Sequence, residues 1–400
     1  MSRIVVRGGR IFDGTGTDPA EGDVVIEDGR IVDVGTGLDG DEAIDVAGRT
    51  VLPGLFDCHT HVTLSHVDTW RIAQDPFSYQ FYVAARNLAA TLGIGITTVR
   101  DAGGADLGIK QAVEDGLIPG PRMQISIIML GQTGGHGDDW LPSGIDVPLF
   151  VPHPGRPSGL VDGPDEVRRK VRELVRDGAD VIKVGTSGGV LSPRDDPRHA
   201  HFRPAELDVL VEEATAAGIF VMAHAQGAGG IKNAVRAGIR SIEHGIYLDD
   251  EAIELMKERG AWLVPTLVAP QGVIDAAEAG VPLPPYVIEK ARSVVDVHRT
   301  AFRHAVEAGV RIAMGTDSGV TPHGENLREL ALMVDGGMTP AAALEATTRS
   351  AAQLLGVDDE LGTIEAGKVA DLVVVSGDPY DVGSLGQRVE QVWKAGARVV

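Results

Sequence analysis

The spacing of hydrophobic and polar residues changes character twice along the chain. In the first fifty residues, short apolar runs such as 24–26 and 31–34 are separated by polar residues and glycines, and Asp28-Gly29 between these two predicts a tight hairpin turn. A similar texture returns near the C-terminus, for example at residues 371–375. We therefore expect both chain ends to meet in one small β-sandwich domain, formed by residues 1–53 and 362–400.

Between the two ends, β-branched apolar runs alternate with longer amphipathic stretches rich in Ala, Glu and Arg. This alternation is typical of parallel strands that are each followed by a helix. Eight such units close a TIM barrel, whose usual size of about 250 residues fits the available length with some insertions. The predicted fold is thus α/β, a (β/α)8 barrel over residues 54–361. Its eight strands are expected at 55–59, 96–100, 124–128, 181–184, 220–224, 241–244, 262–265 and 311–317.

Potential metal ligands stand at five of these eight strand ends. Catalytic groups of a (β/α)8 barrel lie at the C-terminal ends of its strands, so these positions point to a site. The spacing of two residues places both imidazoles of the first strand on the same side of the chain. Imidazole and carboxylate groups suit a divalent ion such as Zn²⁺. The candidates are His59 and His61, Lys183, His224, His244 and Asp317.

A second His-x-His pattern occurs at His199-Ala200-His201, in a proline-rich stretch without a strand before it. We interpret this pair as mainly structural, with a contribution to a substrate loop as the alternative. The comparison shows that two histidines at this spacing do not indicate a metal site by themselves. The other candidate ligands distinguish the first pair from the second.

Several motifs around the candidate ligands resemble the amidohydrolase superfamily. They are Pro53-Gly54-Leu55 after a small sheet, Phe56-Asp57-Cys58-His59-Thr60-His61, Ile182-Lys183-Val184, Ala223-His224-Ala225, Ile242-Glu243-His244-Gly245, Gly315-Thr316-Asp317 and the closing stretch 365–374. The likeness extends over nearly the whole chain. It implies two divalent ions, one held by His59, His61 and Asp317 and the other by His224 and His244, with Lys183 between them as a carbamate formed with CO2.

A metal pair of this kind explains how a lysine can react with CO2. An unperturbed lysine is neutral only about once in 2,500 at pH 7, and nearby cations favour the anionic carbamate over the ammonium. The resemblance further implies that a water activated by the ions attacks an amide carbonyl, while Asp317 transfers its proton to the leaving amine. The expected reaction is hydrolysis of an amide C–N bond, without a serine or cysteine nucleophile.

Substrate contacts are expected from two glycine-rich loops. The loop 131–138 carries His136, either as a catalytic and substrate-binding residue or within a flexible connector. The loop 185–192 offers backbone N–H groups for a carboxylate or an oxyanion, from Ser187, Gly188 and Gly189. Both loops resemble the branch that includes Xaa-Pro dipeptidases, arginine/lysine carboxypeptidases, ochratoxin-cleaving amidases and, more distantly, imidazolonepropionase. In that branch His136 would contact a carbonyl or a carboxylate.

This branch implies a dipeptide or an N-acyl amino acid as substrate. Some prolidase-like relatives carry a tyrosine two residues after the histidine of the fifth strand, whereas this chain has Ala225-Gln226-Gly227, which argues against a strict proline-dipeptide preference. A cyclic-amide hydrolase or a deaminase with one metal ion is an alternative, and Lys183 argues against it. A non-catalytic scaffold barrel is a further alternative. Other residues that could line the mouth of the site are Arg203, His201, Tyr247 and His323.

Composition narrows the range of partners. The chain has 36 basic and 57 acidic residues, a net charge of −21, which disfavours nucleic acids and anionic membrane surfaces as partners. Cys58 is the single cysteine, so an internal disulfide is impossible and a reducing compartment is expected. We find no signal peptide and no apolar run of membrane-spanning length, and we expect a cytoplasmic homo-oligomer.

Overall fold

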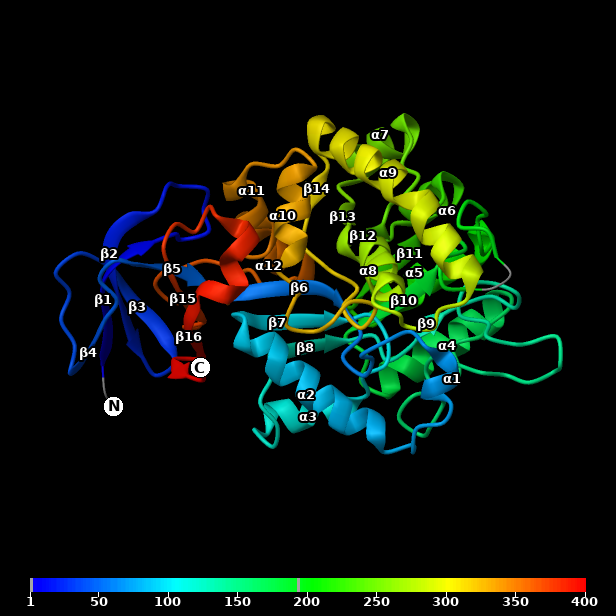
Figure 1. The fold of residues 1–400 in the computed structure, drawn as a ribbon, viewed down its shortest axis with the longest axis horizontal. Coiled ribbons are helices and arrows are strands. Elements are labelled where there is room, and N and C mark those ends of the chain that lie inside the picture. The colour runs from blue at the N-terminus through cyan, green and yellow to red at the C-terminus, as the bar shows by residue number, and fades with distance from the viewer. Residues whose placement is uncertain (1–2, 193–194) are drawn as a thin grey trace.

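The computed structural model describes residues 3–192 and 195–400, and its ribbon shows a sheet of strands beside a larger barrel (Figure 1). Both chain ends contribute to that sheet, as expected from their similar patterns. The strands are hydrogen-bonded as one continuous mixed sheet in the order β17-β16-β15-β5-β1-β2-β3, with β4 paired to β1. Their bounds are β1 Ile4–Ile11, β2 Ala20–Glu27, β3 Arg30–Gly35, β4 Glu42–Asp45, β5 Arg49–Pro53, β15 Leu372–Ser376, β16 Val389–Lys394 and β17 Ala397–Arg398.

The predicted hairpin turn joins β2 and β3. Asp28 and Gly29 both have positive φ, at 51° and 77°, as a two-residue turn with the twist of a hairpin requires. The sheet encloses an apolar core of its own, to which Val24, Ile26 and Trp393 contribute. The two ends of the chain, nearly 400 residues apart in sequence, therefore stabilise the same layer.

The barrel strands form two parallel sheets, β6-β7-β8 and β14-β13-β12-β11-β10-β9. The sheets close on one side through backbone hydrogen bonds from Cys58 N to Met314 O (2.9 Å) and from His61 N to Ser318 O (2.7 Å). The (β/α)8 prediction is confirmed. The strands are β6 Leu55–Thr60, β7 Ile96–Asp101, β8 Arg122–Ile125, β9 Met129–Leu130, β10 Val181–Gly185, β11 Phe220–Ala225, β12 Ser241–His244, β13 Trp262–Val264 and β14 Arg311–Ile312.

The third barrel strand is interrupted where one continuous run was expected. It divides into β8 and β9, and Ile127 between them has φ of +67°, a conformation that a β-branched residue rarely adopts. Backbone hydrogen bonds hold this kink, from Ser126 N to Asp101 O and from Gly104 N to Ile127 O. The apolar run predicted a strand correctly, but its pattern could not show this break.

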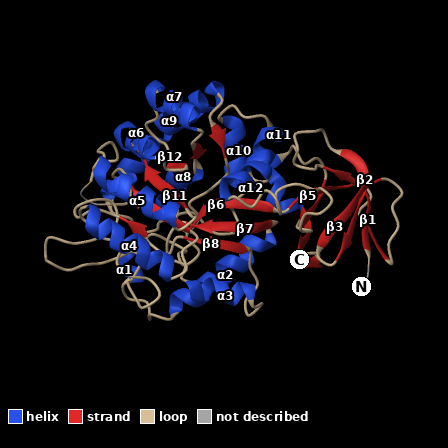
Figure 2. Ribbon diagram, turned by 180° about the vertical axis from the view of Figure 1, so that it is seen from behind, coloured by secondary structure: helices blue, strands red, loops and turns tan. Residues whose placement is uncertain are grey.

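Helices surround the barrel strands (Figure 2). The helix expected at 165–178 is α4, which begins at Pro164 and ends before Gly178, where φ is +93°. No helix of the described residues is both long and apolar enough to cross a membrane. The helices are α1 Thr69–Ile72, α2 Tyr79–Gly93, α3 Leu107–Glu114, α4 Pro164–Arg176, α5 Pro204–Ala216, α6 Ala228–Ala237, α7 Asp250–Arg259, α8 Val268–Glu278, α9 Pro285–Ala308, α10 Arg328–Asp335, α11 Pro340–Ala346, α12 Arg349–Leu355 and the 3₁₀ helix η1 Val382–Arg388.

Candidate active site

A cavity of about 480 Å³ opens where the barrel strands end. All six candidate metal ligands line it, although they lie on or directly after four different strands or in the turn that follows β14. His136, from the loop after β9, lines the same cavity. The barrel thus brings together residues that are up to 258 positions apart in the sequence. The six are His59, His61, Lys183, His224, His244 and Asp317.

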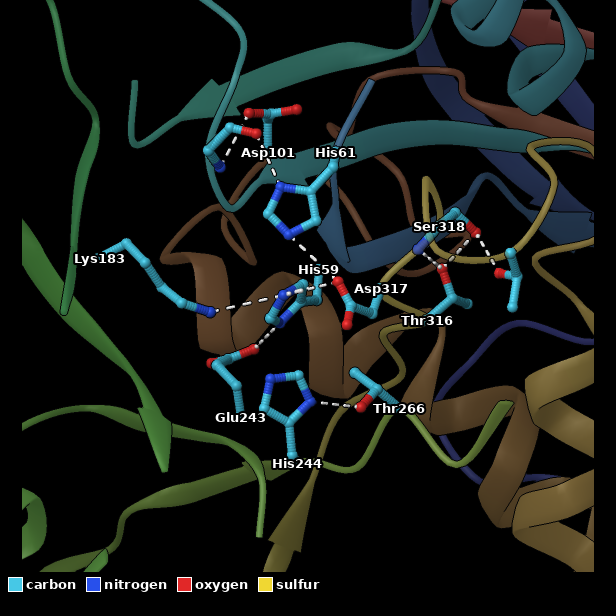
Figure 3. A network of polar contacts seen from close by, with 12 residues as sticks. His59, His61, Asp101, Lys183, Glu243, His244, Thr266, Thr316, Asp317 and Ser318 are labelled. Carbon is cyan, nitrogen blue, oxygen red and sulfur yellow. Dashed lines mark hydrogen bonds and ion pairs between the residues drawn. The ribbon is translucent and has the colours of Figure 1, made fainter. Parts of the chain in front are cut away.

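The side chains at the centre point toward one another (Figure 3). Asp317 Oδ1 lies 3.1 Å from His61 Nε2 and 3.5 Å from His59 Nε2. Lys183 Nζ lies 3.4 Å from His59 Nε2. Ligand atoms of His59, His244 and Asp317 all lie within 4.8 Å of one another, which is close enough for one ion to contact all three.

The outer nitrogen of each of three imidazoles is held by a hydrogen bond. His59 Nδ1 contacts Glu243 Oε2 at 2.8 Å, and His61 Nδ1 donates to the Gly103 carbonyl at 2.7 Å. His244 Nδ1 contacts Thr266 Oγ1 at 2.7 Å. Such partners fix the orientation of metal-binding histidines and, where they accept a proton, leave the inner nitrogen with a lone pair.

This arrangement fits a divalent cation. In their neutral forms, His59 and His61 turn the Nε2 lone pair toward a carboxylate oxygen of Asp317, and acceptors placed face to face repel each other unless a cation lies between them. Imidazole and carboxylate are ligands that Zn²⁺ and similar ions accept. His59, His61, His224, His244 and Asp317 could therefore hold metal, with Lys183 beside them.

His224 extends the centre toward the loops. Its Nε2 lies 3.1 Å from the Gly188 carbonyl, which leaves Nδ1 for a ligand, and its ring is 4.7 Å from that of His244. Burial holds the pKa of both His224 and His244 well below the ordinary value. Both rings are consequently neutral at physiological pH, the form in which imidazole binds metal.

Glu243 is a fully buried carboxylate. It belongs to one of the motifs named above, but no role was predicted for it from the sequence. Its Oε1 accepts hydrogen bonds from Arg100 Nη2 (3.0 Å) and Ser241 Oγ (2.6 Å). Burial alone would raise its pKa, but Arg100 and His59 outweigh burial and lower the pKa to about 2. Glu243 is thus an anion that orients His59. A carboxylate directly before the strand-end histidine His244, within the short strand β12, was the available signal.

Burial also affects Lys183, which is 2% exposed. It lowers the pKa of the amine to about 8, although Glu243 and Asp317 act in the opposite direction. At pH 7 roughly one amine in ten is then neutral, compared with about one in 2,500 for an ordinary lysine. Only the neutral amine reacts with CO2, so this site makes the expected carbamate easier to form.

Asp57 is a second buried carboxylate without an assigned role. It accepts hydrogen bonds from the backbone N–H groups of His59 (3.0 Å) and Thr316 (3.1 Å), from Thr316 Oγ1 (2.6 Å) and from Asn326 Nδ2 (2.8 Å). It therefore connects β6 to the turn after β14 that carries Asp317, whose φ is +61°. A carboxylate between apolar residues just before the His-x-His pair was the available signal.

His136 lies at the centre, whereas the neighbouring loop residues differ from the expectation. The N–H of Gly188 donates to the His199 carbonyl (3.1 Å), and that of Gly189 donates to Asp195 Oδ2 (3.2 Å). Ser187 Oγ donates to the Gly188 carbonyl. These groups are engaged within the protein, and none of the three residues lines the cavity, so their expected contact with a substrate anion has no support in this geometry.

The two glycines instead make room for other groups. A Cβ atom at Gly189 would lie 2.4 to 2.8 Å from atoms of the His136 ring. One at Gly188 would lie 2.3 Å from the Asp196 carbonyl oxygen. Their small size therefore permits close packing of this loop on His136.

Four further residues were expected near the mouth of the site. None of them lines the cavity in the described part of the chain. His323 instead contacts the carbonyl of His61 through Nε2 at 3.2 Å, behind the first strand end. His298, which sequence reasoning missed, does line the cavity and donates from Nε2 to the His244 carbonyl (2.8 Å). The four are Arg203, His201, Tyr247 and His323.

Comparison with known proteins agrees with this geometry. The profile of the Amidohydrolase family matches residues 50–399. The ochratoxinase of Aspergillus niger is 38% identical over 365 residues, which cover 86% of this chain and 75% of that protein. The solved structure of that enzyme has a TM-score of 0.87. A Xaa-Pro dipeptidase solved with methionine bound in its active site has a TM-score of 0.90 at 36% identity, covering 99% of both chains.

Two other relatives bear on the reaction. A prolidase solved with N-methylphosphonate-L-proline has a TM-score of 0.89 at 36% identity and covers 99% of both chains. The imidazolonepropionase of a Geobacillus species is 25% identical over 397 residues, covering 88% of this chain and 83% of that protein. The resemblance stated from the motifs is confirmed at the level of the family.

Proposed function

Because the chain belongs to the amidohydrolase family, we propose that it hydrolyses the amide C–N bond of a dipeptide or an N-acyl amino acid at a centre of two divalent ions. The observation that carries this proposal is the convergence of four histidines, one aspartate and one buried lysine at the ends of five strands. Zn²⁺ is the proposed ion. When bound, divalent ions polarise a carbonyl and lower the pKa of a coordinated water toward 7.

The residues of the chain divide the remaining tasks. His59, His61 and Asp317 would hold one ion and His224 and His244 the other, with the carbamate of Lys183 between them. The Asp317 carboxylate, 16% exposed toward the cavity, accepts the proton of the attacking water and passes it to the leaving nitrogen. Glu243 keeps the His59 ring in place during this transfer.

The cavity supports an apolar substrate. Aromatic and aliphatic side chains line most of it, among them Trp70, Phe150, Leu191 and Tyr286. Among the described lining residues, Lys183 is the only lysine, and no arginine is present. Gln226 lines the cavity at the position where some prolidase-like relatives carry a tyrosine, which supports a substrate range wider than proline dipeptides.

The test combines metal content with a substrate screen. The protein is purified, its metal content per chain is measured by mass spectrometry, and dipeptides, N-acyl amino acids, lactams and lactones are assayed for turnover. About two equivalents of metal together with amide cleavage would support the proposal. One equivalent together with ammonia release would favour deamination and overturn it. The cytoplasmic location and the homo-oligomer stay predictions.

A further inference from the structure

Gln226 directly follows β11 and is buried in the wall of the cavity. It is 5% exposed and lines the cavity two positions after the proposed ligand His224. Its backbone is held on both sides, because its N–H donates to Ser187 Oγ (2.8 Å) and its carbonyl accepts from Tyr247 N (2.8 Å). These contacts fix the position of the residue without using its side-chain amide.

The side-chain amide of Gln226 has no hydrogen-bond partner in the described part of the chain. Oε1 is enclosed by the protein and accepts no hydrogen bond from residues 3–192 or 195–400. Nε2 donates to no residue of the same ranges. A polar group that is nine-tenths buried is therefore unused beside the proposed metal centre.

Two other buried side-chain amides show the contacts that a structural role requires. Asn87 Nδ2 donates to the carbonyls of Val62 (3.0 Å) and Leu64 (2.8 Å), and Asn326 Nδ2 donates to Asp57 Oδ2 (2.8 Å). A buried amide without such partners destabilises a fold unless a ligand supplies the missing hydrogen bonds. In the wall of this cavity, a bound substrate is the ligand that can supply them.

A glutamine amide is complementary to groups that both donate and accept hydrogen bonds. Its oxygen accepts and its NH2 group donates, and the terminal torsion is soft enough for either atom to turn toward a ligand. A carboxamide or a peptide group offers both an N–H and a C=O in return. A carboxylate can only accept, so it leaves the glutamine oxygen without a donor.

The charges of the cavity wall also favour a neutral group. Burial raises the pKa of Asp139 to about 6, so this carboxylate is mostly ionised at about pH 7. Among the described lining residues no arginine is present, and Lys183 of the proposed centre is the only lysine. Outside that centre, a substrate carboxylate would lose water without meeting an opposite charge among these residues, a cost that a neutral amide avoids. The lining carboxylates outside the centre are Asp68, Asp139 and Asp146.

We propose that Gln226 is a specificity-determining residue that forms hydrogen bonds with a carboxamide or peptide group adjacent to the scissile bond, so that the protein prefers substrates with an amidated carboxyl group over free acids. This inference rests on the proposed amide hydrolysis and narrows its substrate class. The preferred substrates are acyl amino acids and dipeptides whose carboxyl group is itself part of an amide.

A matched pair of substrates tests this preference. N-acetyl-L-phenylalanine amide and N-acetyl-L-phenylalanine have the same scissile bond and nearly the same volume, and they differ only in the group that is proposed to meet Gln226. The zinc-loaded protein is assayed with both by the release of acetate. We expect kcat/KM to be about tenfold higher for the carboxamide, equivalent to one net hydrogen bond. Equal values, or a higher value for the free acid, would overturn the inference.

A variant separates Gln226 from the other properties of the cavity. Methionine has nearly the length of glutamine but no amide, so in Gln226→Met the ratio of the two kcat/KM values should fall toward one, mainly through loss on the carboxamide, at unchanged metal content. The control is Gln391→Met, which removes the contact of Gln391 Oε1 with Trp393 Nε1 (3.1 Å) in β16 and should leave the ratio unchanged. An unchanged ratio in Gln226→Met would overturn the inference.

Thermal unfolding distinguishes this role from a structural one. Because the Gln226 amide has no described partner to lose, Gln226→Met should not lower the Tm of the zinc-loaded protein without substrate. A lower Tm would assign the amide to the fold and overturn the inference.

Binding of the reaction products decides the preference without turnover. Calorimetry with L-phenylalanine amide and L-phenylalanine should show about tenfold tighter binding of the carboxamide, and a loss of this difference in Gln226→Met. Equal affinities for the unmodified protein would overturn the inference. If no amide is cleaved in any assay, the proposed function fails, and the binding comparison still decides the role of Gln226.

Discussion

Two pairs of histidines with the same spacing differ in the backbone that carries them and in the contacts of their side chains. His59 is 1% exposed, lies on a barrel strand and has both ring nitrogens in polar contacts. His199 is exposed and lies on a loop. In that loop the contacts of the second pair are made by the backbone, with the carbonyl of His199 accepting from Gly188 N and the N–H of His201 donating to Thr186 O. A histidine pair becomes a metal site through the partners that surround it.

The largest expected difference is between two variants that each lack one histidine, His59→Ala in the first pair and His199→Ala in the second. His59→Ala removes a proposed ligand and takes away the partner of Glu243 Oε2, so we expect loss of bound metal and a fall in kcat/KM of about a thousandfold or more. His199→Ala should change the free energy of unfolding by no more than about 0.5 kcal/mol and leave activity intact. Metal analysis and amide turnover measure both. Equal losses in the two variants would contradict the comparison.

A second prediction concerns the partner rather than the ligand. Glu243→Gln keeps the shape of the side chain but removes the charge that orients His59, so metal affinity should fall about 10- to 100-fold. Metal affinity is measured by titration with a competing chelator. Glu251→Gln is the matched control, because the Glu251 side chain, which pairs with Lys232 and Arg236, is 62% exposed. Unchanged metal affinity in Glu243→Gln would show that His59 binds metal without a charged partner.

A smaller effect is expected at the loop that packs on His136. Gly189→Ala places a methyl group against the His136 ring, so the ring must shift from its present position beside His224. We expect about a tenfold fall in kcat/KM at unchanged metal content, since overpacking costs about 1–3 kcal/mol. Gly93→Ala is the control, because a Cβ there meets no atom within 4 Å. Full activity in Gly189→Ala would contradict the expected displacement.

The smallest effect concerns a buried carboxylate that forms no ion pair with any described residue. Glu329 accepts the N–H groups of Leu267 (2.7 Å) and Val268 (2.8 Å) at the start of α8, and burial raises its pKa to about 8 from 4.5. The folded protein then binds one more proton than the unfolded chain between these pH values. Its contribution to stability is fully present below pH 4.5 and is lost as the pH rises to about 8.

Unfolding by guanidinium at pH 5, 7 and 9 measures this loss. Glu329→Gln should remove this part of the pH dependence, whatever its effect on stability at pH 5. Glu325→Gln, on an exposed residue paired with Arg328, should leave the pH dependence as it is. A pH dependence that is identical in the unmodified protein and Glu329→Gln would mean that Glu329 is ionised in the fold. In contrast to Glu329, Glu243 has Arg100 beside it and should stay ionised throughout this range.

The proposed ligands were accessible to sequence reasoning because they follow apolar strand patterns directly. His224 is the second-last residue of β11 and His244 the last of β12, and Lys183 lies within β10. The residues that orient these ligands were harder to predict from the sequence. Glu243 meets Arg100 from a different strand, 143 positions away, and nothing local to either residue announces the contact. The glycine-rich loop was predicted to offer N–H donors to a substrate. Its N–H groups instead donate to other residues of the loop and its neighbours.

The sequence by itself determined the alternation of strands and helices, and with it the order of metal-ligand types along the barrel, because both follow from local periodicity and strand ends. Only the tertiary structure decided which groups orient those side chains, where the third strand breaks at Ile127, and which residue contacts Nδ1 of His136. These features depend on atoms that meet across the barrel or between loops. Hydrogen bonds act over about 3 Å in space, whatever the distance along the chain.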